Sequence, residues 1–163
     1  KCPGIIDSSI VSNELIMNID FAPTLLDFAG IIVPDNMQGK SFKSSFSDGE
    51  YIGRDAVYYH YYEYPIWHKV QPHYGVRTSK YKLIHFYYSM DNWELYDLEN
   101  DPNEMNNIYG ESPEELISSL KSKLNDLKKE YKDEFTLDEM KLMTDTVIQR
   151  VYNEPSKLKT KIL

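Results

Sequence analysis

Cysteine and arginine are both scarce in this 163-residue sequence. The single cysteine, Cys2, has no partner for an internal disulfide, so a disulfide framework is excluded and we expect Cys2 to be inert. The few arginines offer little bidentate grip on phosphate, and a formal net charge of −8 repels a nucleic-acid backbone. We therefore expect no nucleic-acid partner.

Long apolar runs are also lacking. No stretch of eighteen apolar residues exists, so we expect no membrane partner. The first residues lack the order of a signal peptide and an initiator methionine, and the apolar pair Ile5 and Ile6 reads as a strand already under way. We expect the chain to begin inside a longer protein, with any export signal upstream. Its compartment stays unknown, and a periplasmic or secreted location fits the full-length protein.

Aromatic residues, by contrast, are abundant, with 14 tyrosines gathered mainly between Tyr51 and Tyr96. Tyrosine suits half-buried strands, because its ring covers a sheet face while its hydroxyl stays wet or bonded. Turn residues separate several aromatic and β-branched runs, and a hairpin turn at 78–80 joins two of them. The pattern predicts an antiparallel sheet with strands at 56–62, 74–78, 81–88 and 93–97.

Helices are predicted before and after this sheet. Residues 13–29 have helical spacing interrupted by Pro23, which predicts two short helices, the second capped by Asp20 and followed by a left-handed Gly30. Residues 31–50 are poor in apolar residues and rich in turn formers, and we expect a surface loop there.

The clearest helix is expected at about 113–131. Ser112 and Pro113 suggest a capping box with proline in the first turn. A narrow apolar stripe follows, and it needs an apolar partner, for which the tyrosine-rich sheet is available. A weaker helix through 151 and a tail should follow residue 133. The predicted stripe consists of Leu116, Leu120, Leu124, Leu127 and Tyr131.

Four histidines are the first candidates for chemistry. None has the spacing of a recognised metal motif, so no metal ligand is expected. His60 and His85 lie inside predicted strands, where a hydrogen-bonded structural role is favoured over a ligand role. His68 and His73 flank a proline-containing loop that leads into a strand, from which side chains can enter a pocket. They are the candidate binding residues, with a solvent-exposed loop imidazole as the alternative.

No other pattern supplies a catalytic site. The acidic segment 97–104 lacks the glycine and glutamate register of a calcium loop and is interpreted as a turn. No serine lies in a nucleophile elbow, and no glycine-rich loop could hold a phosphate. We therefore assign no catalytic residue to this chain.

Several segments together resemble the formylglycine-dependent sulfatases of the alkaline-phosphatase-like superfamily. Residues 20–30 are similar to a D-x-x-P-T-L-L-D-x-A-G helix of that family, and Pro34 with 38–42 to its P…Q-G-x-S-L loop, although Phe42 replaces the usual leucine. Residues 75–84 match a G-V-R-T-x-x-Y-K-L-I hairpin, and 94–104 an E-L-Y-D-L-x-x-D-P-x-E strand and turn. Four soft patterns in family order make a specific match.

The resemblance implies an α/β fold in two parts. Residues 1–50 would be the tail of the large alkaline-phosphatase-like α/β domain, with helices and a connecting loop. Residues 51–135 would form a C-terminal subdomain, a small antiparallel sheet packed by the helix at about 113–131. The resemblance covers about residues 1–131, and the Lys-rich sequence beyond it, 136–163, is expected to be a helical extension or tail.

The same resemblance implies hydrolysis of a sulfate ester, on a sulfated glycan or an aryl sulfate. The family uses a formylglycine, made from Cys or Ser in C/S-x-P-x-R, and a calcium ion. No proline here has Cys or Ser two positions earlier, so both cofactors are expected in a missing N-terminal catalytic domain and none on this chain. The fragment alone should be inactive. It would supply scaffold and a pocket edge, where His73 and, less directly, His68 would contact substrate.

Two other functions stay open. The sheet and helix patterns do not identify the nucleophile, so a phosphoesterase or phosphonate hydrolase of the same superfamily is an alternative. A non-catalytic carbohydrate-binding module is another, because aromatic faces stack on sugars, although strand tyrosines more often pack against a helix.

Overall fold

The computed structural model describes residues 4, 6, 11–46, 53–65 and 68–153. The chain divides into two compact units, Lys1–Val57 and Tyr58–Leu163. The predictions made for Cys2, for a strand at the first residues and for a tail after 153 fall outside the described residues. Among the described helices, none has both the length and the apolar character needed to cross a membrane.

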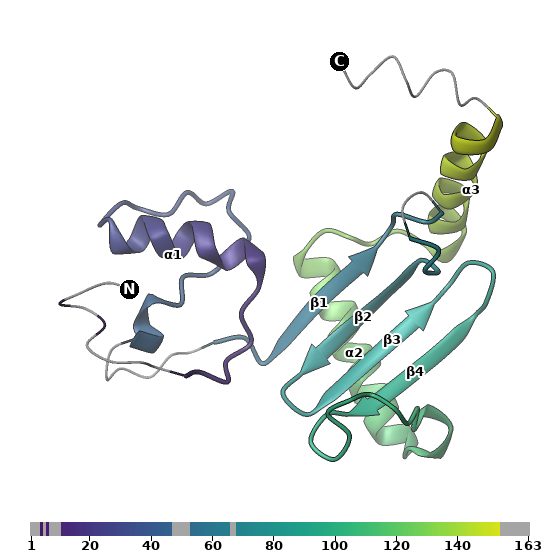
Figure 1. Cartoon of the computed structure of the whole chain (residues 1–163), viewed down its shortest axis with the longest axis horizontal. Coiled ribbons are helices and arrows are strands. Elements are labelled where there is room, and N and C mark those ends of the chain that lie inside the picture. Colours follow the sequence, from purple (N-terminus) through teal and green to yellow (C-terminus); the bar gives the residue numbers. More distant parts are fainter. Residues whose placement is uncertain (1–3, 5, 7–10, 47–52, 66–67, 154–163) are drawn as a thin grey trace. The chain divides into compact units, whose positions relative to one another are not determined.

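The first unit contains the two short helices expected before the sheet, a 3-10 helix η1 (Asn18–Asp20) and an α-helix α1 (Phe21–Phe28) (Figure 1). Gly30 has φ +71°, and the amides of Gly30 and Ile31 donate to the carbonyls of Asp27 and Leu26. This is the Schellman arrangement, so the predicted left-handed glycine after the helix is confirmed.

Asp20 corrects the sequence prediction. It stands at the N-cap position of α1, but its carboxylate does not cap that helix. The two oxygens instead accept hydrogen bonds from the amides of Met17 and Lys40, at 2.7 and 2.8 Å, and from the guanidinium of Arg54. A fully buried carboxylate is better satisfied by a cation and two amides, one nearby and one distant in the sequence, than by the helix it precedes.

A four-stranded sheet consists of β1 (Ala56–Tyr61), β2 (His73–Thr78), β3 (Tyr81–Phe86) and β4 (Asn92–Asp97). All of it belongs to the second unit except Ala56 and Val57, the first two residues of β1. The strands follow one another in sequence order, and β2 with β3 and β3 with β4 pair antiparallel. The predicted strands are therefore present, with ends that differ by at most two residues. Both hairpins are local, which is why turn residues located them.

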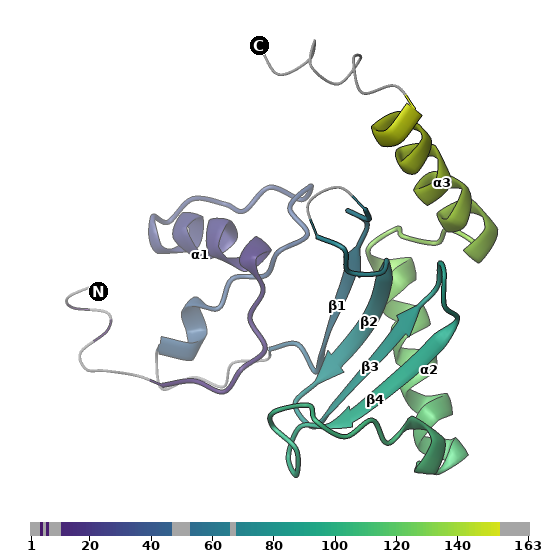
Figure 2. The ribbon, with the colours of Figure 1, turned by 45° about the vertical axis from the view of Figure 1, so that its right-hand side comes forward.

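Helix α2 (Glu114–Glu130) lies across one face of the sheet, as Figures 1 and 2 show. The core between the helix and the sheet consists of apolar side chains that are buried from solvent. Val76, Leu83 and Leu95 are each 0% exposed, and Leu120 and Leu124 come from the helix. The remaining buried helix residue is Ile117, whereas the predicted stripe residues Leu116 and Leu127 are only half-buried.

The beginning of α2 differs from the prediction, whereas the weaker helix predicted after residue 133 is present. No capping box forms at Ser112, because Pro113, which has no side-chain acceptor, occupies the N-cap position of α2. The Ser112 hydroxyl donates to the Ile108 carbonyl beside the preceding 3-10 turn η3 (Tyr109–Glu111). The weaker helix is α3 (Leu137–Asn153), and it has the reciprocal cap instead. Glu139 accepts from the Thr136 amide at 2.8 Å, and the Glu139 amide donates to the Thr136 hydroxyl at 3.3 Å.

Candidate functional site

The two histidines singled out by the sequence lie on either side of Tyr61, the last residue of β1. His73 opens β2, next to Tyr74, whose ring lies under the Lys128 ammonium of α2. Side chains alternate along a strand, so His73 lies on the face that α2 does not cover. Its ring stacks on Tyr61 at 5.5 Å and 22°, and Phe86, its partner on β3, lies 5.0 Å away.

A backbone contact determines which nitrogen of neutral His73 carries the proton. Nδ1 of His73 lies 2.8 Å from the carbonyl oxygen of Gln71, and a carbonyl can only accept. Nδ1 therefore carries the hydrogen and donates it. Nε2 keeps its lone pair, and within the described residues no protein group bonds to it. Neutral His73 thus offers an acceptor for a hydroxyl group.

His68 lies in the loop before β2 and is exposed. Its Nδ1 is 3.2 Å from the phenol oxygen of Tyr61, and the two rings are 6.4 Å apart. The structure thus brings His68 and His73 to one end of the sheet through a residue that sequence reasoning missed. Tyr61 is one of many tyrosines in that region, and nothing in the pattern separates it from the others.

The opposite face of the sheet carries a second polar cluster, around Asp133. One oxygen of this carboxylate, Oδ2, accepts from the hydroxyls of Tyr58 and Tyr62 at 2.5 and 2.6 Å and from Nδ1 of His60 at 2.7 Å. Nε2 of His60 is 3.0 Å from the Tyr87 hydroxyl. His60 is therefore the hydrogen-bonded sheet residue that the sequence predicts.

Burial and hydrogen bonds determine the charges in this cluster. Burial by itself would raise the pKa of Asp133, but the donors Tyr58, Tyr62 and His60 hold that pKa below its usual value. Burial lowers the pKa of His60 despite the nearby carboxylate. The stable form is consequently an ionised Asp133 beside a neutral His60, which donates to Asp133 through Nδ1 and accepts from Tyr87 through Nε2.

His85 has a comparable structural role. Its ring stacks on Trp93 at 4.1 Å and 6°, while Nδ1 contacts the Tyr74 hydroxyl at 2.8 Å and Nε2 contacts Asp91 at 2.7 Å. Burial lowers its pKa. Both ring nitrogens are occupied by protein partners, in agreement with the structural role predicted for His85.

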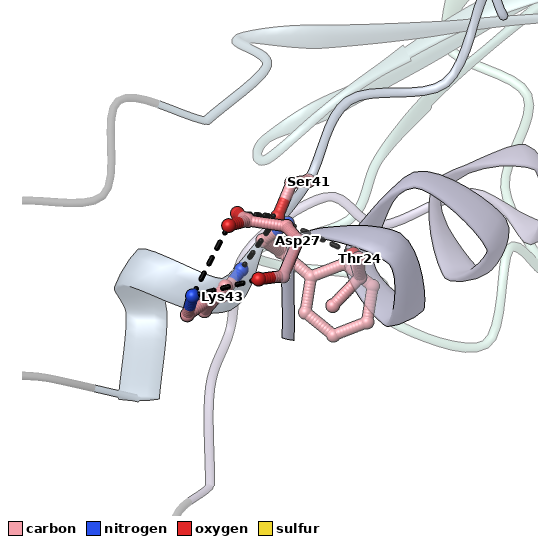
Figure 3. A network of polar contacts seen from close by, with 5 residues as sticks. Thr24, Asp27, Ser41 and Lys43 are labelled. Carbon is pink, nitrogen blue, oxygen red and sulfur yellow. Dashed lines mark hydrogen bonds and ion pairs between the residues drawn. The ribbon is translucent and has the colours of Figure 1, made fainter. Parts of the chain in front are cut away.

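A further network, in the first unit, fastens the loop after α1 to that helix (Figure 3). The hydroxyl of Ser41 donates to Asp27 at 2.7 Å, and the ammonium of Lys43 contacts the carbonyl and carboxylate of Asp27 at 2.8 and 3.1 Å. The Phe42 amide donates to the Thr24 hydroxyl at 3.0 Å, and the Phe42 ring is buried. The segment predicted as a surface loop is thus anchored in part.

The two aspartates of the acidic segment 97–104 accept from nearby backbone amides, as the turn interpretation predicts, whereas its glutamates pair with Lys80 and Lys82. Asp97 accepts from the amides of Glu99 and Asn100, and Asp101 accepts from the Asn106 amide. Across the described ranges, no group of three or more histidine, cysteine or acidic side chains is placed to hold a metal ion. The described residues therefore do not fit the calcium centre of a sulfatase, and the sequence has no C/S-x-P-x-R motif from which formylglycine is made.

Comparisons with known proteins show that the chain is similar to sulfatases. A family model described as "N-sulphoglucosamine sulphohydrolase, C-terminal" matches residues 1–130. The chain is 47% identical over 137 residues to an N-acetylglucosamine-6-O-sulfatase of Bacteroides thetaiotaomicron, covering 82% of this chain and 25% of that protein. It is 31% identical over 134 residues to arylsulfatase K of Bos taurus, covering 77% of this chain and 24% of that protein.

Solved structures extend the comparison to the fold. A protein in complex with its substrate D-glucosamine-2-N,6-O-disulfate is 47% identical, with a TM-score of 0.70 over 76% of this chain and 26% of that one. A phosphonate monoester hydrolase of Agrobacterium radiobacter is 21% identical, with a TM-score of 0.52 over 71% of this chain and 25% of that one, and shows only the shared fold. The chain spans about a quarter of the length of these relatives.

Proposed function

Because this chain belongs to the sulfatase family and matches the C-terminal domain of that family, we propose that the whole protein hydrolyses sulfate esters of amino sugars in glycans. The observation that carries the proposal is the identity of 47% to a relative named as an N-acetylglucosamine-6-O-sulfatase. A solved relative of equal identity binds a disulfated glucosamine as its substrate. Sulfated glycan is therefore favoured over simple aryl sulfate as the substrate class.

The catalytic centre would lie in the part of the protein that precedes this chain in its relatives. The sequence has no C/S-x-P-x-R motif, and the described residues contain no cluster of metal ligands. A formylglycine would supply the nucleophile and calcium the charge compensation there. By this proposal the 163-residue chain has no hydrolase activity of its own.

Exposed apolar side chains of the first unit support a domain boundary near residue 50. Several large apolar side chains of this unit are open to solvent, including Phe21 at 55%, Leu25 at 68% and Ile32 at 91% exposure. Apolar surface of this kind is typical of a segment that packs against a neighbouring domain. We propose that residues 1–50 complete the large α/β domain and that the sheet and α2 form the C-terminal subdomain.

His73 and His68 are the proposed substrate contacts. Neutral His73 has Nε2 available as a hydrogen-bond acceptor, and it is mounted on a strand and flanked by two rings. A sugar hydroxyl is a suitable donor for that nitrogen. His68 is on a loop within reach of the same end of the sheet, so it would contact a neighbouring group of the sugar.

A phosphonate or phosphate ester is the second candidate substrate class. It stays an alternative because the sheet and helix patterns of this chain do not identify the nucleophile. Sequence upstream of this chain discriminates the two, because a C/S-x-P-x-R motif indicates a sulfatase.

The test is sulfate release by the full-length protein from D-glucosamine-2-N,6-O-disulfate, measured by ion chromatography. The full-length protein should release sulfate and the 163-residue chain should not. His73→Ala should raise KM about tenfold, as loss of one hydrogen bond of about 1.4 kcal/mol would. Lys69→Ala, an exposed neighbour in the same loop, is the control. Absence of sulfate release by the full-length protein would refute the proposal.

A further inference from the structure

We propose that Tyr61 is a positioning residue that holds the imidazoles of His73 and His68 in a fixed relation for recognition of a sugar. The proposal rests on the function proposed above, and it adds a residue with a role of its own. Tyr61 contacts both histidines through different parts of its side chain. Its ring stacks on His73, and its hydroxyl reaches Nδ1 of His68.

The ring of Tyr61 is one member of a row of three. Tyr61 on β1, His73 on β2 and Phe86 on β3 lie side by side, with His73 5.5 Å from Tyr61 and 5.0 Å from Phe86. Each ring comes from a different strand, and Tyr59 adds a further edge contact to His73 at 6.0 Å. Neighbouring rings on a rigid sheet restrict the rotation of the imidazole.

The hydroxyl of Tyr61 contacts the exposed histidine of the pair. His68 is an exposed loop residue, and its contact of 3.2 Å to Tyr61 ties it to the sheet. A phenol hydroxyl is the better donor, so Nδ1 of His68 accepts and Nε2 carries the hydrogen. His73 has the opposite arrangement, because its Nδ1 donates to the Gln71 carbonyl.

The two imidazoles therefore offer complementary groups. His73 presents an acceptor at Nε2, and His68 presents a donor at Nε2. Adjacent hydroxyls of a sugar each donate and accept, so such a pair can recognise two of them. Without the Tyr61 hydroxyl, His68 would lose both its fixed tautomer and its fixed place, and the pair would bind sugar less tightly.

A double-mutant cycle in the full-length protein tests this inference. KM and kcat are measured on D-glucosamine-2-N,6-O-disulfate for Tyr61→Phe, His68→Ala and the double variant. Tyr61→Phe should raise KM about threefold with kcat unchanged, and the double variant should be no worse than His68→Ala alone. Tyr61→Leu, which also removes the stack, should raise KM about tenfold.

The control is Tyr88→Phe, which removes a hydroxyl that bonds to Asp145 at 2.5 Å. It should leave KM unchanged. Additive effects of Tyr61→Phe and His68→Ala, or equal losses in kcat for Tyr61→Phe and Tyr88→Phe, would overturn the positioning role while leaving the sulfatase activity intact. A full-length protein that neither cleaves nor binds the disulfated sugar in calorimetry would instead refute the proposed function, and this inference with it.

Discussion

Nδ1 of His60 lies 2.7 Å from the carboxylate of Asp133, although the two residues are 73 positions apart in the sequence. His60 belongs to β1, and Asp133 belongs to the segment that joins α2 to α3. The contact therefore joins the first strand of the sheet to the chain that leaves its covering helix. Tyr58 and Tyr62 donate to the same oxygen, so one buried carboxylate organises this end of the unit.

Replacement of this carboxylate should destabilise the protein. In Asp133→Asn the amide can no longer accept from three donors as the ionised group does, and buried hydroxyls are left unsatisfied. We expect the free energy of unfolding to fall by about 2–3 kcal/mol, measured by urea unfolding. Asp126→Asn, an exposed change on α2, is the control and should stay within about 0.5 kcal/mol. Equal stability of the two variants would contradict the importance of the cluster.

Stability should also decline on acidification, in two steps. The pKa of His60 is lowered in the folded protein, so below about pH 6.5 the unfolded chain binds a proton that the folded chain resists. The pKa of Asp133 is lowered as well, so its contribution is present above about pH 4 and is lost as pH falls through the folded pKa. Both effects make the protein less stable in acid.

His60→Gln separates the first step, because glutamine can donate and accept but does not titrate. The loss of stability between pH 7 and pH 5 should be smaller in this variant than in the wild type, as measured by urea unfolding at each pH. His68→Gln, on the exposed loop, is the matched replacement. If His60→Gln kept the full wild-type slope, His60 would not be the titrating group.

Gly75 should not tolerate a side chain. A Cβ at this position would lie 2.4 Å from the Leu83 carbonyl oxygen and 2.5 Å from the Tyr59 hydroxyl. Because Leu83 belongs to the paired strand, its carbonyl cannot move without disturbing the sheet. Gly75→Ala should cost about 3 kcal/mol, whereas Gly110→Ala, with nothing within 4 Å, should be nearly neutral. Thermal unfolding of the two variants compares them directly, and similar midpoints would count against the close approach.

Leu124 should be a core position, in contrast to a leucine on α3. Leu124 is 1% exposed and Leu142 is 65% exposed. Leu124→Ala leaves a cavity between α2 and the sheet and should cost about 2–5 kcal/mol. Leu142→Ala should cost less than about 0.5 kcal/mol. Chemical unfolding measures both, and a large loss for Leu142→Ala would mean that this side chain is covered in the protein.

Local features were predictable because neighbouring residues determine them. Gly30 ends α1 through backbone bonds to residues a few positions earlier, and the hairpin turns follow from residues within the turns. Ser112 was predicted wrongly for a related reason. The helix begins one residue later than the pattern suggests, so Pro113 occupies the N-cap position, and the Ser112 hydroxyl donates to the Ile108 carbonyl of the preceding turn.

The candidate site was predictable only in part. His68 and His73 are noticeable as histidines beside a proline-containing loop, and their role as substrate contacts stays a prediction. Tyr61 and Asp133 gave no such signal. One tyrosine among 14 is not distinctive, and the partners of Asp133 lie more than seventy positions away.

Motif spacing and apolar periodicity thus determined the family, the strands and the main helices, because each depends on side chains close together along the chain. Tertiary structure alone decided which carboxylate each buried donor meets. Asp20, predicted as a helix cap, instead accepts from the amide of Lys40 and the guanidinium of Arg54. Asp133 accepts from side chains of β1, including His60. The physical reason is that a buried charge takes the partners that packing brings to it, and sequence distance places no limit on them.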